Sequence, residues 1–314
     1  MKISVTCPTR GRKDILCRGI DSLINFLSDT ADVEFLFRFD DDDISTLEEV
    51  MKYYETEDVH PISTTDKFRC GLYPKTSNKF RWGESTFTII ETISKKHDVT
   101  MKFIVGHRHR YHYLNRYIDE LIYVSDGEYV VMWTDDLELI INDNYEGWDL
   151  LIGEGEGQHY IFLFRINSHT GKHGWPVVCP RKFFEINGRL CPNVLDDQWY
   201  NELCKLLSPD VRVILHWGVY HHCQFGTSVQ DSTCQEGRMV WNSVRENNVS
   251  EDYEYYSYED MVKIKEYMDE HPNIKKTTQY HDTSLSGIPL DPRGPSGRWN
   301  PENLRSVLNE NNKG

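Results

Sequence analysis

Asp135 and Asp136 are the residues whose types and spacing most directly suggest chemistry. They follow the run EYVVMW at residues 128–133, which is typical of a buried strand, and apolar residues resume at Leu137. Two carboxylates on a rigid strand end suit a hard divalent cation such as Mg²⁺ or Mn²⁺, which prefers oxygen ligands. A simple turn between two strands is the other interpretation of the pair.

Two further polar segments follow predicted strands. The segment CPTRGR at residues 7–12 comes after a short apolar strand, and the acids DDDD at residues 40–43 follow a strand at residues 33–39. In an open α/β sheet, ligands bind in the crevice outside the carboxyl ends of the strands. We therefore expect these segments to meet Asp135 and Asp136 at one edge of a sheet. Helix caps are the alternative explanation for acids at strand ends.

The elements that must position these residues alternate between strand and helix. Over the first 140 residues, some segments carry apolar residues at helical spacing and others are short β-rich runs. The pattern predicts an α/β fold with a mostly parallel central sheet and helices on both of its faces. The polar residues 63–83 are expected to be irregular. The predicted strands are residues 2–7, 33–39, 101–106 and 128–133, and the predicted helices are residues 15–27, 44–54, 84–97 and 114–125.

The second half of the chain is less regular. Residues 159–166 and 211–217 are predicted strands, and residues 196–207 are predicted to form an amphipathic helix that opens on two acids, as the helix dipole favours. Further on, an acidic helical segment is followed by a tail rich in Gly, Pro and Asn. We expect one domain at residues 1–250 and a C-terminal helical extension and tail at residues 251–314.

Composition limits the classes of function. The formal net charge of −15 argues against a broad basic surface for nucleic acid, because neutralising phosphates requires clustered Lys and Arg. The eight cysteines form no CxxC pair, which is typical of free thiols in a reducing compartment. No segment resembles a signal peptide or reaches the roughly 20 apolar residues that span a bilayer. We expect a soluble, cytoplasmic protein.

The order of these motifs resembles that of nucleotide-sugar glycosyltransferases of the GT-A fold, close to glycosyltransferase family 2 and its phage-type relatives. The resemblance covers roughly residues 1–240 and implies a GT-A, Rossmann-like fold. ISVTCPTRGRKDILCRGIDSL resembles the family's opening strand and helix, and FLFRFDDDD resembles its second strand. LNRYIDELIYVSDGEYVVMWTDDLEL resembles the stretch that leads to the metal-binding Asp-x-Asp, and EGWDLLI resembles the Gly-Trp-Asp of phage-type members.

The resemblance implies a divalent cation, Mn²⁺ or Mg²⁺, at the acid pair. Asp136 is the predicted direct metal ligand, and Asp135 is predicted to be a second ligand or a contact to the ribose through water. Glu138 is a weaker candidate, because its side chain would point along the next strand. The chain departs from the family pattern at Thr134, which stands where the usual triplet has its first acid.

Three histidines offer a further metal ligand. His222 is followed by Gly226 and by residues 231–233, which read Asp-Ser-Thr, and this order matches phage-type members. The resemblance therefore implies that His222 completes the metal site, with His216 and His221 as alternatives. A zinc site is another interpretation of these histidines, but no second Cys/His pair has finger-like spacing.

The resemblance also implies a nucleotide-diphosphate sugar as donor, and a UDP-sugar is the expected one. The acids after the second strand would hold the base and ribose. Guanidinium groups would hold the diphosphate, since their planar fork matches phosphate oxygens. Exposed charges at a helix start, including Arg116, are the alternative for the basic segment GHRHRYHYLNR. The predicted donor-binding residues are Pro8, Thr9, Arg10, Arg12, Asp40, Asp42, Arg108, Arg110, Asn115 and Asp135.

The segment PNVLDDQWYNEL resembles the acidic motif that supplies the family's catalytic base. Asp197 is the predicted base and Asp196 the alternative, while a helix cap is the structural interpretation of both. The base would take a proton from an acceptor hydroxyl, and the resemblance implies that the sugar's configuration inverts. Residues 63–83 and the segment GEGEG at residues 153–157 are expected lids that exclude water.

The predicted function is that of a metal-dependent inverting glycosyltransferase, a hexosyl- or pentosyltransferase. The acceptor is a glycan, a lipid carrier or a hydroxymethylated pyrimidine in phage DNA, where Tyr111, Tyr113 and Trp82 would stack on bases. A phage-encoded enzyme would act in the host cytoplasm. One alternative is a sugar-nucleotide nucleotidyltransferase, although CPTRGR poorly matches a glycine-rich phosphate loop. The other is a non-catalytic carbohydrate- or partner-binding protein on a glycosyltransferase scaffold, an interpretation that Thr134 favours.

Overall fold

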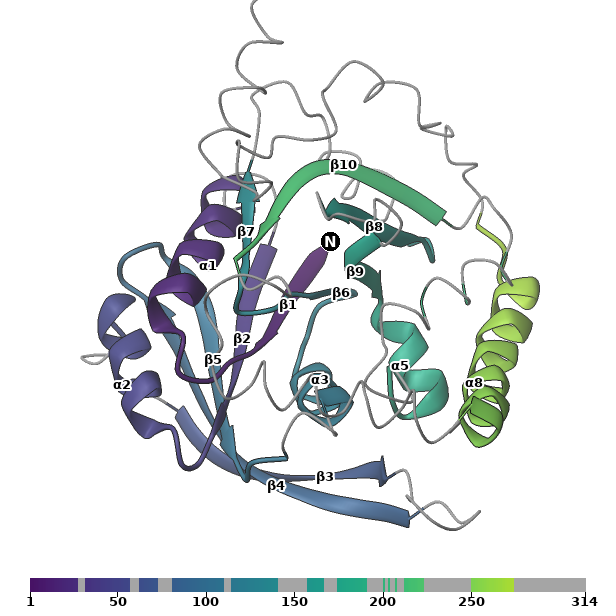
Figure 1. The fold of residues 1–314 in the computed structure, drawn as a ribbon, viewed down its shortest axis with the longest axis horizontal. Helices are drawn as coiled ribbons and strands as arrows, with labels where there is room; N and C mark the ends of the chain where they lie inside the picture. The colour runs from purple at the N-terminus through teal and green to yellow at the C-terminus, as the bar shows by residue number, and fades with distance from the viewer. Residues whose placement is uncertain are drawn as a thin grey trace, which may run out of the picture.

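The computed structural model describes residues 1–27, 32–56, 62–72, 81–109, 114–140, 157–166, 174–190, 200, 203, 207, 212–222 and 250–273. These residues form a ten-stranded sheet with the order β3-β4-β5-β2-β1-β6-β9-β8-β10-β7 (Figure 1). The strands are β1 (Lys2–Pro8), β2 (Asp32–Asp40), β3 (Ile62–Leu72), β4 (Arg81–Ser94), β5 (Val99–Gly106), β6 (Tyr129–Met132), β7 (Leu137–Ile140), β8 (Ile161–Ile166), β9 (Gly174–Pro180) and β10 (Arg212–His221). The helices are α1 (Lys13–Leu27), α2 (Ile44–Tyr53), α3 (Leu114–Tyr123), α5 (Arg181–Asn187) and α8 (Ser250–Glu270).

Four neighbouring strands, β5, β2, β1 and β6, run parallel and form the centre of the sheet. Their sequences are nearly continuous apolar runs because strands covered on both faces bury every side chain. Each of the four was predicted from the sequence, as were the helices α1, α2 and α3 between them. The predicted α/β class is confirmed, and the arrangement is consistent with the GT-A architecture that the motif order implies.

Helices cover both faces of this sheet, as predicted (Figure 1). On one face, Ile3, Val5 and Cys7 of β1 belong to the apolar cluster that includes residues of α1 and α2, such as Ile20 and Val50. On the other face, strand residues such as Leu36, Val130 and Met132 share a second cluster with α3, α5 and α8. The alternation of side chains along each strand assigns neighbouring residues to opposite clusters.

The sequence-based prediction for residues 84–97 is wrong. These residues were predicted to form a helix, but residues 81–94 form β4, which pairs antiparallel with β5 and β3. Residues 63–83 were expected to be irregular, but residues 63–72 belong to β3 and residues 81–83 to β4, and residues 73–80 lie outside the described residues. The composition explains the outcome, since the threonines and isoleucines of TFTIIETI are β-branched and favour a pleated, half-buried strand.

The remaining strands extend the sheet beyond β6. The predicted strands at residues 159–166 and 211–217 correspond to β8 and β10, whereas β7, β9 and α5 were not predicted. The helix predicted at residues 196–207 lies almost wholly outside the described residues. The helical segment that begins near residue 250 is confirmed as α8, whose Met261, Ile264 and Met268 are buried in the second apolar cluster.

Strand β7 contacts α1 at very short range. A Cβ atom on Gly19 would lie 2.0 Å from the backbone oxygen of Leu137, so only glycine allows this approach. Three residues further along α1, the hydroxyl of Ser22 accepts a hydrogen bond of 2.9 Å from the backbone N–H of Leu139. The helix therefore fixes the position of the strand that follows Asp135 and Asp136.

The described cysteines Cys7, Cys17 and Cys179 are free thiols in the buried core. Burial raises the pKa of Cys7, and the neighbouring charges of Asp135 and Asp136 raise it further. Within the described ranges, we find no helix with the length and apolar character needed to cross a membrane.

Candidate functional site

The segment after β1 is bonded to the acid pair that follows β6. The hydroxyl of Thr9 and the backbone N–H of Arg10 donate hydrogen bonds of 3.1 and 3.3 Å to Oδ2 of Asp135. The guanidinium of Arg12 lies 2.8 Å from Oδ1 of Asp135 and 3.7 Å from Oδ2 of Asp136. The predicted convergence of these two strand ends is therefore observed in the structure, through direct contacts.

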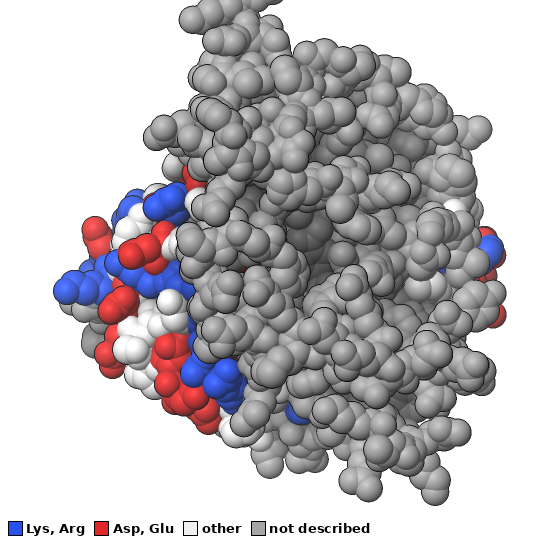
Figure 2. All heavy atoms as spheres, in the orientation of Figure 1, with Lys and Arg blue, Asp and Glu red and all other residues white. Residues whose placement is uncertain are grey.

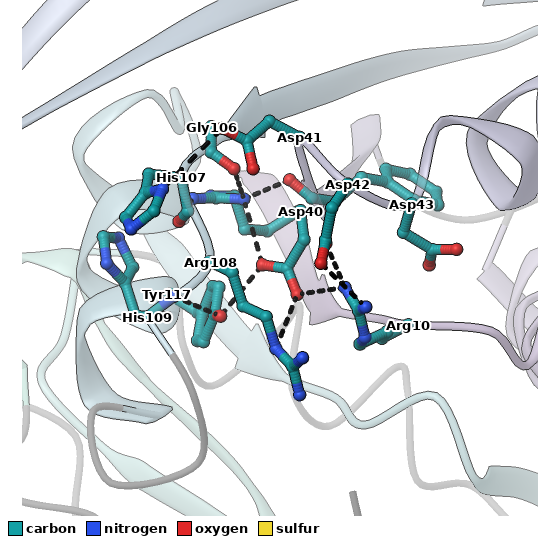
Figure 3. A network of polar contacts seen from close by, with 12 residues as sticks. Arg10, Asp40, Asp41, Asp42, Asp43, Gly106, His107, Arg108, His109 and Tyr117 are labelled. Carbon is teal, nitrogen blue, oxygen red and sulfur yellow. Dashed lines mark hydrogen bonds and ion pairs between the residues drawn. The ribbon is translucent and has the colours of Figure 1, made fainter. Parts of the chain in front are cut away.

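Arg10 connects the same segment to the acids that follow β2 (Figure 3). Its Nη1 donates a hydrogen bond of 2.9 Å to Asp40 and also bonds Asp42, while its Nη2 donates to the second oxygen of Asp42 at 3.0 Å. The backbone N–H of Gly11 donates to Asp43 at 2.9 Å, and Gly11 has a φ of +65°, which glycine adopts without strain. Segments from β1, β2 and β6 thus meet at one edge of the sheet.

Asp40 lies at the centre of a group of donors, and its side chain is only 5% exposed. The hydroxyl of Tyr117 donates to Oδ1 at 2.9 Å, and the buried Arg38 is 3.8 Å from the same oxygen. On Oδ2, the Nε of Arg108 at 3.8 Å joins the closer contact from Arg10. Figure 3 shows Arg108, Tyr117 and Arg10 directed at Asp40 from the segment after β5, from α3 and from the segment after β1.

A buried network of polar groups holds Arg38, whose guanidinium lies 3.8 Å from Asp40. Arg38 donates to Glu120 at 2.5 Å and to the backbone oxygen of His107 at 2.9 Å. The other oxygen of Glu120 lies 2.6 Å from Nε2 of His109 and also accepts from Ser85. Burial alone raises the pKa of Glu120, but the His109 hydrogen bond and the Arg38 charge outweigh it and lower the pKa to about 2. Glu120 is therefore a carboxylate at neutral pH, and it orients Arg38.

The charges on the two acidic clusters are strongly perturbed. Burial raises the pKa of Asp135 to about 6, against the lowering effect of Arg12 and with a further rise from Asp136. The hydrogen bond from Arg10 lowers the pKa of Asp42, and it raises the pKa of Arg10 itself. The two arginines after β1 therefore act as counter-ions, Arg12 for the acids after β6 and Arg10 for the acids after β2.

His222, which was predicted to be a metal ligand, lies beside the acid pair. Its backbone N–H donates to the backbone oxygen of Asp136 at 2.8 Å, and its Nε2 is 3.0 Å from Oε2 of Glu138. The predicted ligands Asp136 and His222 are thus neighbours. The imidazole, however, is paired with Glu138, which the sequence analysis ranked lower.

The described residues do not form a metal-binding donor set. Both oxygens of Asp135 are engaged by Thr9, Arg10 and Arg12, and Oδ1 of Asp136 accepts a hydrogen bond of 2.7 Å from Thr134. Among the residues described, no three Asp, Glu, His or Cys side chains are grouped so that they could hold an ion. The hydroxyl at position 134 therefore serves as a hydrogen-bond donor to Asp136.

Other predicted site residues have the following positions. Pro8 ends β1, directly before Thr9, and Asn115 is buried in the first turn of α3. Arg110, Asp196 and Asp197 lie outside the described residues, as do the side chains of His216 and His221 and the segment at residues 151–156.

The residues of this site that the sequence analysis missed include Arg38, Tyr117 and Glu120. A signal for Arg38 was present, because it interrupts the apolar run of β2 and a buried charge of that kind needs a partner. The face of α3 that carries Tyr117 and Glu120 could not be assigned without knowing where the helix packs against the sheet.

A separate groove of about 590 Å³ runs along α1. Polar side chains of α1, including Asp21 and Asn25, line it together with Tyr53 of α2 and with Glu138 and Leu139 of β7. It reaches the acid-pair region only through Glu138, so the contacts around Asp40 lie outside it.

No protein-family model and no curated protein matches the chain. Among solved structures, the chain is similar to the crystal structure of Staphylococcus aureus TarS residues 1–349, with 12% identity, a TM-score of 0.42, and coverage of 69% of this chain and 60% of that one. The complex of the same TarS fragment with UDP-GlcNAc gives 12% identity, a TM-score of 0.40, and coverage of 78% and 66%. This chain therefore spans about 60% of the length of the first of these structures. We draw no functional conclusion from likenesses this distant.

Proposed function

We propose that this chain is a glycosyltransferase that moves a sugar from a nucleotide-diphosphate sugar to an acceptor hydroxyl. The observation that carries the proposal is the direct bonding of three strand-end segments, residues 8–12, 40–43 and 134–136, at the carboxyl edge of a parallel sheet. A crevice at this edge is where open α/β sheets bind nucleotides. The motif order that resembles family 2 points to the same chemistry.

In this proposal, arginines at this edge bind the diphosphate of the donor, and an aspartate binds its ribose or base. Arg10, Arg12 and Arg108 are the cations next to the acids, and their forked guanidinium groups suit a diphosphate. Asp40, held by Tyr117 and Arg10, is oriented to accept hydrogen bonds from the ribose or base of the donor. The expected donor is a UDP-sugar.

The chemical step would use the acidic motif at residues 196–197. Asp197, with Asp196 as the alternative, would remove the proton from the acceptor hydroxyl as the oxygen attacks the anomeric carbon. The bond between that carbon and the diphosphate oxygen breaks, and the nucleoside diphosphate leaves. Attack from the opposite face inverts the configuration, as the family resemblance implies. Positive charge from the arginines would stabilise the leaving diphosphate.

A divalent cation, Mn²⁺ or Mg²⁺, remains a prediction from the motif. When bound, such an ion supplies Lewis-acid stabilisation of the leaving diphosphate. The described residues Asp135, Asp136 and His222 are already engaged by protein groups, so we assign no step to the ion. An assay with and without EDTA decides whether the ion is needed.

The proposed acceptor is a glycan, a lipid carrier or a hydroxymethylated pyrimidine in DNA. Figure 2 shows blue Lys and Arg interspersed with red Asp and Glu over the described surface beside α1 and α2. Interspersed charges of both signs suit a small ligand at a local site better than a long polyanion on this part of the surface.

The test is nucleoside diphosphate release from a panel of UDP-, GDP- and other nucleotide sugars, with Mn²⁺, with Mg²⁺ and with EDTA. Asp40→Asn is the site variant, and Asp41→Asn is its matched control, because Asp41 is 54% exposed and lies one residue away. Losing a hydrogen bond to a charged group costs about 1.5–3 kcal/mol, so we expect the donor KM of Asp40→Asn to rise about 10- to 100-fold.

Release with one donor, reduced in Asp40→Asn and retained in Asp41→Asn, supports the proposal. Thermal melting of both variants establishes that they fold. No release from any donor, with no rise in melting temperature on adding nucleotides, would overturn it in favour of the non-catalytic binding protein. Release of pyrophosphate from a sugar phosphate and a nucleoside triphosphate would instead support the nucleotidyltransferase.

A further inference from the structure

The guanidinium of Arg10 is shared between two carboxylates with very different surroundings. Its Nη1 bonds Asp40, whose side chain is 5% exposed, and both of its terminal nitrogens bond Asp42, whose side chain is 51% exposed. A charge pair in water contributes little, because solvent screens it, whereas a pair at a buried carboxylate is held firmly. We therefore expect the contact with Asp40 to persist and the more exposed contact with Asp42 to exchange with other anions.

A second guanidinium approaches the same carboxylate from another element. The Nε of Arg108, in the segment after β5, lies 3.8 Å from Oδ2 of Asp40, the oxygen that Arg10 also contacts. Both arginine side chains are partly exposed, at 26% for Arg10 and 29% for Arg108. Figure 3 shows both guanidinium groups next to the same carboxylate oxygen of Asp40. Two cations spaced around one carboxylate match the two phosphates of a diphosphate.

We propose that Asp42 is a displaceable counter-ion of Arg10, which the diphosphate of the donor replaces while Asp40 continues to hold the guanidinium. This inference rests on the proposed function, and it changes the role of Asp42. The residue was predicted to contact the base and ribose, whereas here it competes with the donor's phosphates. Because Asp42 carries the same sign of charge as phosphate and offers the same pair of oxygens to the guanidinium fork, the two exchange one for one.

The inference predicts that removing the Asp42 carboxylate tightens the binding of a diphosphate, although Asp42 is a residue of the site. Without the Asp42 carboxylate, Arg10 stays bonded to Asp40, but its second nitrogen no longer has to leave a partner before it meets phosphate. Removing Arg10 should have the opposite effect. An exposed ion pair contributes about 0.2–1 kcal/mol, so the expected gain in affinity is about 1.4- to fivefold.

The experiment is isothermal titration of the full chain with inorganic pyrophosphate, with and without Mg²⁺. Pyrophosphate carries the diphosphate without a base, so the identity of the nucleotide does not enter. The variants are Asp42→Asn, Arg10→Gln and the double variant. The control is Asp41→Asn, which removes the same charge from a neighbouring carboxylate of nearly equal exposure, 54% against 51%.

We expect Asp42→Asn to bind pyrophosphate about 1.4- to fivefold more tightly than Asp41→Asn, and this difference should vanish when Arg10 is also replaced. Equal affinities of Asp42→Asn and Asp41→Asn, or weaker binding by Asp42→Asn, would overturn the inference while nucleoside diphosphate release could still uphold the proposed function. If no variant binds pyrophosphate, the inference is wrong, and if donors are also not cleaved, the proposed function is wrong too.

Discussion

Glu120 is the residue on which the buried part of the site depends most. It is fully buried, pairs with Arg38 at 2.5 Å, and accepts bonds from His109 and Ser85. Replacing Glu120 by Gln would leave the Arg38 guanidinium buried without its counter-charge, and breaking a buried pair typically costs about 3–5 kcal/mol. We expect a loss of that size in the free energy of unfolding, measured in urea. Glu91→Gln, an exposed position on β4, should change it by less than about 0.5 kcal/mol.

The same carboxylate gives this prediction a pH dependence. The pKa of Glu120 is about 2 in the fold, below its ordinary value of 4.5. Because the folded pKa lies below the unfolded one, its contribution is complete above about pH 5 and is lost as the pH falls towards about 2. The stability of the wild type should therefore fall more steeply over this range than that of Glu120→Gln, so the two curves converge in acid. Curves that stay parallel would mean that the pKa of Glu120 is not lowered in the fold.

Residue-level prediction from the sequence succeeded where topology alone decides proximity. The sequence predicted that the segments carrying Thr9, Arg12 and Asp135 meet, because parallel strands place their carboxyl ends on one edge of the sheet. Tyr117 could not be assigned to Asp40, because this contact depends on which face of α3 meets the sheet. The counter-ion role of Arg12 also depends on side-chain packing that no spacing encodes.

At the scale of elements, the docking of β7 against α1 sets the geometry behind the acid pair. The backbone of Leu137 approaches Gly19 so closely that an added Cβ would lie 2.0 Å from its oxygen. We expect Gly19→Ala to force the helix and strand apart at a cost of about 1–3 kcal/mol, measured by thermal or urea unfolding. Donor binding should weaken as well, because β7 follows directly on Asp136. Arg18→Ala, exposed on the same helix, is the control, and equal stability of the two variants would contradict the docking.

Element prediction failed at β4 for a definable reason. The segment TFTIIETI has apolar residues at positions compatible with a helix, but its β-branched side chains favour a strand. Pairing with β5 and β3, which periodicity does not reveal, decided the outcome. The strands β1, β2 and β5 were easier, because long apolar runs bounded by Gly, Pro or Asp are typical of buried parallel strands.

At the scale of the whole molecule, the net charge of −15 opposes the approach of an anionic donor. Long-range repulsion is screened as the Debye length shrinks from about 30 Å at 0.01 M salt to about 8 Å at 0.15 M. We expect the association rate of pyrophosphate, measured by stopped flow, to rise with salt over this range. The local arginines act at short distance and should chiefly affect dissociation. An association rate that falls with salt would show that the arginines dominate the field at long range as well.

The labelling rate of the buried Cys7 thiol can report on local opening of the site. Cys7 is 0% exposed, lies on β1 next to Pro8, and has the acid pair close by. A thiol in this position reacts with an alkylating reagent only when the strand is transiently released, so its labelling rate, followed by peptide mass spectrometry, measures the free energy of local opening. A ligand that joins the segments after β1, β2 and β6 should slow that labelling in proportion to its occupancy. Engagement of the crevice could then be read in a crude mixture, before any product is identified.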